Sequence, residues 1–129
     1  LSRGLGDVYK RQGKDESNST GVCYIGTVSG TSISFGSKVT YKNGNLYQIV
    51  ATFDSSNNKV VIGYQVTGTG YGTAIVGTVS GTSISFGSEV VFSNNNTANY
   101  PLALTFDSNN NKVVFAYRDG ANSNYGTAV

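Results

Sequence analysis

Apolar and polar residues alternate over short runs along most of this chain, and a period of two predicts β-strands. In the run 47–53, this period places four side chains on one face of a strand: Tyr47, Ile49, Ala51 and Phe53. The run 59–65 is apolar on both of its faces. We therefore expect this strand to lie between two other layers of the protein.

Two further strands are predicted upstream, at 22–29 and 32–41, with Gly36 as a candidate bulge in the second. Turn-forming residues separate the four strands, including Ser-Gly-Thr at 29–31 and an Asx-rich segment at 54–58. Short strands joined by such turns predict antiparallel pairing.

The four-strand unit occurs twice. Residues 26–37 recur without change as residues 77–88, and residues 52–65 recur with few changes from Thr105 onward. A third copy starts at Gly126. The chain is therefore divided, in order, into the end of a preceding repeat or a linker, repeat 1, repeat 2 and the start of a truncated repeat 3: 13–20, 21–71, 72–125 and 126–129.

A period of roughly 50 residues with four antiparallel strands per unit matches the blade of a β-propeller. The sequence thus predicts an all-β fold, as a partial propeller of two blades and the start of a third. A β-solenoid or an array of small sandwiches also satisfies the pattern. In each case neighbouring units must stack, because one unit alone cannot bury both faces of its fourth strand.

Composition favours strands and limits the available chemistry. The chain is rich in Gly, Ser, Thr, Asn and Tyr, and it has one cysteine and no histidine. Metal and nucleophile chemistry would need His or Cys partners for Cys23, so we expect no metal site, no cofactor and no catalytic residue. No apolar run approaches the roughly 20 residues that span a bilayer, which argues against membrane insertion.

Residues 1–12 are expected not to belong to the protein. The segment Ser2 to Gln12 matches, codon by codon, the translation of a transposase adapter used in DNA library preparation. It also contains the whole net positive charge, because acidic and basic residues balance from Gly13 onward. The charge therefore gives no indication of nucleic acid as a partner.

Ligand-binding chemistry is expected around the loop that follows each fourth strand. This region combines tyrosines with hydrogen-bonding groups, as sugar- and protein-binding surfaces do. The candidate residues are Tyr64, Tyr71, Tyr117, Arg118, Asp119, Asn122 and Tyr125. The alternative is that the tyrosines pack between units with only their hydroxyl groups exposed. Asp54 and Asp107, in the turns before the fourth strands, are expected to have a structural capping role.

Two resemblances add to this interpretation. The segments GTAIVGTVSGTSISFGS and TFDSNNNKVVFAYRDG resemble tandem β-repeats of phage tail-fibre and large bacterial surface proteins in environmental sequences, which implies an extracellular, cell-surface or virion location. Residues 52–54 and 105–107 are similar to the start of the Asp-box of sialidase-type propellers. The glycine and the aromatic residue of that motif are replaced in both copies, by Ser56 and Lys59 and by Asn109 and Lys112. This second similarity implies blade geometry and not sialidase activity.

The sequence thus predicts a non-enzymatic recognition or adhesion module of a larger surface repeat protein. Its expected partners are a surface glycan or protein and further repeats of the same chain. Two alternatives stay open, namely a passive structural spacer and the non-catalytic blades of a sialidase-like propeller enzyme.

Overall fold

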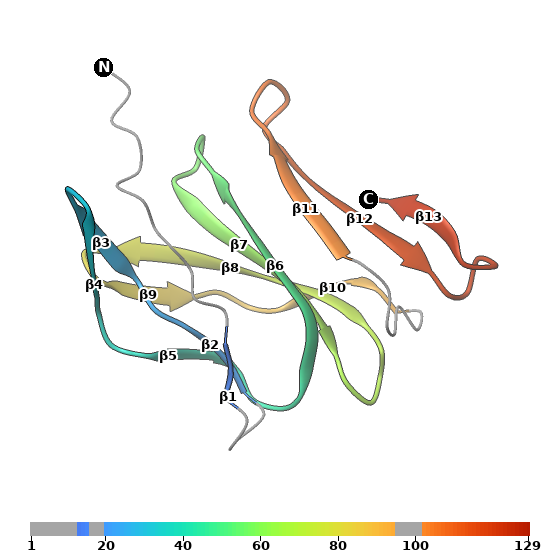
Figure 1. Ribbon diagram of the computed structural model, residues 1–129. Helices are drawn as coiled ribbons and strands as arrows, with labels where there is room; N and C mark the ends of the chain where they lie inside the picture. The colour runs from blue at the N-terminus through green and yellow to red at the C-terminus, as the bar shows by residue number, and fades with distance from the viewer. Residues whose placement is uncertain (1–12, 16–19, 95–101) are drawn as a thin grey trace.

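The computed structural model describes residues 13–15, 20–94 and 102–129, and the adapter-like segment 1–12 lies outside the described residues. The all-β prediction is confirmed, since the strands form several small antiparallel sheets (Figure 1). The strands are β1 (Gly13–Asp15), β2 (Thr20–Cys23), β3 (Gly26–Ser29), β4 (Ser32–Phe35), β5 (Val39–Lys42), β6 (Leu46–Asp54), β7 (Lys59–Val66), β8 (Gly72–Ser80), β9 (Ser83–Phe86), β10 (Val90–Ser93), β11 (Leu102–Asp107), β12 (Lys112–Asp119) and β13 (Tyr125–Ala128). Within the described ranges, no helix has the length and apolar character needed to cross a membrane.

Three sheets and one hairpin organise these strands. The first sheet has the order β1-β2-β5, and the third sheet has the order β11-β12-β13. Between them lies the five-stranded central sheet, in which β6, β7 and β8 form an antiparallel meander. β9 and β10 pair with the two halves of β8, and β3 pairs with β4 as a separate hairpin.

The central sheet combines strands from two successive sequence repeats. β6 and β7 come from residues 21–71, whereas β8, β9 and β10 come from residues 72–125. The last strand of repeat 1 pairs with the first strand of repeat 2, from Val60 opposite Gly77 to Gln65 opposite Gly72. The boundary of this sheet is therefore offset from the boundary of the sequence repeat, because the sheet begins with the last two strands of repeat 1. Backbone hydrogen bonds between β7 and β8 join the two repeats.

The predicted strand at 32–41 is divided in the structure. Its two parts are β4 and β5, and the same division separates β9 from β10 in the second copy. The Gly36 N–H donates to the carbonyl of Ile25 at 2.8 Å, and the Gly87 N–H donates to the carbonyl of Val76 at 3.0 Å. After Gly36 the chain leaves the β3-β4 hairpin and pairs with β2 as β5, and after Gly87 it leaves β9 and pairs with the first half of β8 as β10. The irregularity predicted at Gly36 is therefore a break between two strands and not a bulge within one strand.

The predicted face of the strand at 47–53 is confirmed for Ile49, Ala51 and Phe53 and wrong for Tyr47. Gln48 has a φ of 51°, and the pairing of β6 with β7 shifts register between Tyr47 and Val50. An extra residue of this kind reverses the alternation of side chains. Ile49 therefore packs against the core, with Ala51 and Phe53 beyond it, whereas Tyr47 is exposed.

β7 is covered on both faces, as its sequence predicts. Val60, Ile62 and Tyr64 are buried in the main core on one face. On the other face Gly63 lies under Phe115 of β12, so closely that an added Cβ would be 2.5 Å from the ring. Full burial of a side chain such as Ile62 contributes about 1.5–3 kcal/mol, so this strand is a large part of the hydrophobic stabilisation.

The sheets stack through an aromatic contact that occurs at both interfaces. Tyr41 of β5 contacts Tyr64 with ring centroids 5.6 Å apart, and Phe92 of β10 contacts Tyr117 at the same distance. Phe92 also stacks on Phe115 at 4.4 Å. Tyr41 and Phe92 hold equivalent positions in the two repeats, as do Tyr64 and Tyr117, so the second interface reproduces the first.

The close approach at Gly63 gives a stability prediction. Gly63→Ala is expected to lower the free energy of unfolding by about 1–3 kcal/mol, because the new methyl group must displace the Phe115 ring. Gly87→Ala is the matched control, since the nearest atom to its added Cβ is the Val76 carbonyl oxygen at 3.8 Å. We expect the control to change stability by less than about 0.5 kcal/mol. Urea denaturation measures both, and equal effects would contradict the described packing.

Candidate functional site

The strands leave two opposite ends on the stack of sheets. The turns 54–59 and 107–112 lie at one end, which we call the Asp-turn end (Figure 1). The loops 67–71 and 120–124, which follow β7 and β12, lie at the opposite end, which we call the loop end. The Ser56 hydroxyl donates to the side-chain oxygen of Asn111, so the two Asp turns are direct neighbours.

At the Asp-turn end the carboxylates bond within their own turns. Asp54 Oδ1 accepts the backbone N–H groups of Ser56 and Asn57, each at 3.0 Å, and Oδ2 accepts the Asn57 amide at 2.8 Å. Asp107 makes the equivalent three bonds. The side-chain amide bond first, and then the backbone bonds, hold the pKa of both carboxyl groups below the ordinary value. These carboxylates cap turns.

The candidate tyrosines separate into two pairs. Tyr64 is 0% exposed and Tyr117 is 8% exposed, and both lie in the interfaces between sheets. Tyr71, which directly precedes β8, is 38% exposed, and Tyr125, the first residue of β13, is 66% exposed. The structure therefore does not bring the four rings together. Only the second pair offers its rings at the surface, at the loop end.

The polar candidates divide in the same way. Asp119 is largely buried, and its Oδ1 accepts the Ala121 N–H at 3.0 Å while its carbonyl accepts the Asn122 N–H at 3.2 Å. Asp119 therefore shapes the loop 120–124 from within. Arg118 and Asn122 are exposed on either side of it, on the same segment as Tyr125.

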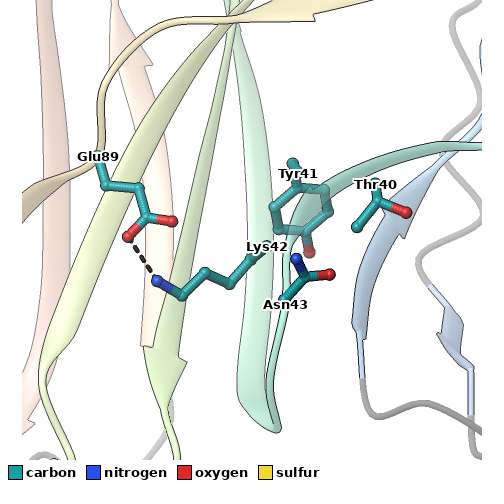
Figure 2. A pocket seen from close by; sticks show the side chains of 5 residues that line it. All are labelled: Thr40, Tyr41, Lys42, Asn43 and Glu89. Atoms are coloured by element: carbon teal, nitrogen blue, oxygen red, sulfur yellow. Dashed lines mark hydrogen bonds and ion pairs between the residues drawn. The ribbon is translucent and has the colours of Figure 1, made fainter.

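A polar recess beside the loop end was not predicted from the sequence. It has a volume of about 340 Å³ and is lined by Thr40, Tyr41, Lys42, Asn43 and Glu89. Figure 2 shows the Lys42 side chain extending toward Glu89, and Nζ lies 2.7 Å from Oε2. This ion pair joins the first sheet to the segment that precedes β10. Its partners are 47 positions apart, so only the offset of the sheets brings them together.

The two charged side chains of the recess, Lys42 and Glu89, form an ion pair with each other. Burial raises the pKa of both Tyr41 and Tyr64, and the nearby Glu89 carboxylate adds to the rise at Tyr64. Both phenols are therefore neutral at ordinary pH. Among the described residues, the Tyr41 hydroxyl has no hydrogen-bond partner, and no three acidic or cysteine side chains are grouped to hold a metal ion. The recess suits a neutral polar ligand better than acid-base chemistry.

The lowered pKa of Asp54 gives a pH prediction. Its capping contribution is complete above the unfolded pKa of about 4 and is lost as the pH falls through the lower folded value. The melting temperature of the wild type should therefore exceed that of Asp54→Ala at pH 7, and this difference should shrink as the pH falls toward 2. Asp107→Ala should behave alike, and Ser55→Ala in the same turn should show no pH-dependent difference. A gap for Asp54→Ala that is constant with pH would contradict the described bonds.

Comparison of this chain with protein-family models, with curated proteins and with solved structures finds no match. No residue role is therefore transferred from a relative. The indication of function comes from the exposed side chains and from their repetition along the stack.

Proposed function

We propose that this chain is a non-enzymatic recognition or adhesion module, part of a larger repeat protein on a cell surface or virion. One observation carries the proposal. Tyr71 and Tyr125 both precede a Gly-Thr-Ala sequence, lie at the same end of successive sheets and are exposed. A large aromatic side chain that recurs at the surface at one place per unit suits a ligand and does not serve the core.

The chemistry of the loop end favours a surface glycan as the ligand. Tyrosine presents a flat apolar face together with a hydroxyl group, which allows it to stack on a sugar ring and to hydrogen-bond to it. Asn122 adds an exposed donor and an exposed acceptor on the second loop, and Arg118 is exposed near the end of β12. Because each further unit would add another copy of the loop, weak individual sites would gain avidity.

We further propose that the sheets are blades of a partial β-propeller. The meander β6-β7-β8, completed by β9 and β10, has the strand order of a blade. The equivalent contacts Tyr41 to Tyr64 and Phe92 to Tyr117 support a stack that repeats with each unit. A β-solenoid with the same contacts is the alternative architecture.

The carboxylates support a non-enzymatic role. Glycosidases generally use a pair of carboxyl groups, one as acid and one as base or nucleophile. Asp54, Asp107 and Asp119 bond within their own turns, and Glu89 pairs with Lys42. The Asp-box similarity of two of these turns is consistent with their capping bonds.

A passive spacer is the second candidate, favoured by the tight contact between neighbouring units. A Cβ added to Gly36 would clash with the Thr82 carbonyl oxygen, so the chain just after β4 lies directly against the turn between β8 and β9. Such contacts give a stiff stack, which is what a spacer requires. A spacer needs no ligand at the loop end.

Glycan-array binding separates the two candidates. The wild type is expected to bind, and the double variant Tyr71→Ala/Tyr125→Ala is expected to lose about tenfold or more in affinity, because both stacking rings are removed. The variant Tyr71→Phe/Tyr125→Phe retains the rings and should keep most of the binding.

A folded wild type that binds nothing across a broad array would reject the glycan proposal and favour the spacer. Circular dichroism shows whether the fold is intact. Equal binding by the wild type and the double alanine variant would place recognition elsewhere on the surface.

A further inference from the structure

A glycine-led strand segment occurs at three equivalent places in the structure, as Gly-Val-Cys once and as Gly-Thr-Ala twice. Its copies are Gly21–Cys23 in β2, Gly72–Ala74 in β8 and Gly126–Ala128 in β13. β5 covers the first copy and β10 covers the second, both as antiparallel strands with one register shift in the pairing. The third copy pairs with β12 on one side, and no described strand pairs with its other side.

The third copy is set into its sheet in the same register as the second. Thr127 lies opposite Tyr117 in β12, just as Thr73 lies opposite Tyr64 in β7. The outer edge of β13 therefore presents the same positions as the edge of β8 that holds β10. In Figure 1, β13 is the margin of the third sheet.

In the first two copies, an aromatic ring of the covering strand packs over the glycine. A Cβ added to Gly21 would be 2.6 Å from the Tyr41 ring, and a Cβ added to Gly72 would be 2.5 Å from the Phe92 ring. These rings come from the covering strands β5 and β10. At Gly126 an added Cβ would meet no atom of the described residues within 4 Å. The place that an aromatic ring fills over the first two glycines is open over the third.

The backbone of β13 is also oriented for a further strand. The Val129 N–H donates to the Phe115 carbonyl at 3.0 Å, and the Phe115 N–H donates to the Val129 carbonyl at 2.9 Å. In an antiparallel ladder the direction of these groups alternates, so the N–H and C=O of Ala128 point away from β12. Exposed edge groups of this kind are templates for strand addition.

We propose that the outer edge of β13 is an acceptor site for an antiparallel strand with the pattern valine, any residue, aromatic, polar, supplied by a further copy of this repeat. This is the pattern of both covering strands, 39–42 and 90–93. Main-chain hydrogen bonds to Ala128 and the neighbouring edge supply affinity, and the aromatic ring over Gly126 supplies selectivity. The acceptor site is independent of the ligand that the loop end binds.

A labelled synthetic peptide of residues 87–94, with the sequence GSEVVFSN, tests the site by fluorescence anisotropy with the whole chain. Saturable binding is expected, together with slower amide exchange in residues 126–128. The same peptide with Phe92→Ala should bind about tenfold more weakly or worse, because the ring over Gly126 is lost. Absence of binding to the folded protein, or equal binding by both peptides, would overturn the proposal.

Gly126→Val blocks the site from the protein side. The open space around Gly126 accommodates the side chain, so the melting temperature should not fall, whereas peptide affinity should fall about tenfold or more. Thr127→Val is the matched control, because its side chain is on the opposite face of β13 and its volume is unchanged. Undiminished peptide binding by Gly126→Val would show that the peptide binds elsewhere and would also overturn the proposal.

Discussion

The burial of β7 on both faces is the constraint on which the rest of the structure depends. A strand with apolar side chains on each face has no stable position at a surface, so it requires a layer on either side. Tyr41 and the first sheet cover the face of Ile62 and Tyr64, and Phe115 of the third sheet covers the face of Gly63. Stacking of units is therefore required to bury the apolar surface of the repeat.

Small residues facing large rings make that stacking repeatable. Phe92 enters the interface because Gly72 carries no side chain beneath it, and Phe115 approaches β7 because of Gly63. The first interface uses Tyr41 over Gly21 in the same way. Since interiors are close-packed, each ring fixes the spacing between its two sheets. The same geometry then recurs wherever the glycine and the aromatic residue recur.

The two ends of the stack differ in how their polar groups are used. At the Asp-turn end, carboxylates such as Asp54 bond to the backbone of their own turn, and neighbouring turns bond to each other. At the loop end, Tyr71 and Tyr125 keep their rings exposed. One end therefore contributes to cohesion between units, whereas the other end leaves aromatic side chains exposed.

Alternation, turn residues and the exact repeat of 26–37 were enough to determine strands, antiparallel pairing and an all-β fold, because these depend on local periodicity. The pattern also indicated that β7 is sandwiched. It did not reveal the bulge at Gln48, the separation of buried Tyr64 from exposed Tyr71, or the pairing of Lys42 with Glu89. The bulge depends on how β6 pairs with β7, and the other two features depend on contacts across stacked sheets, which join residues whose separation along the chain carries no periodic signal.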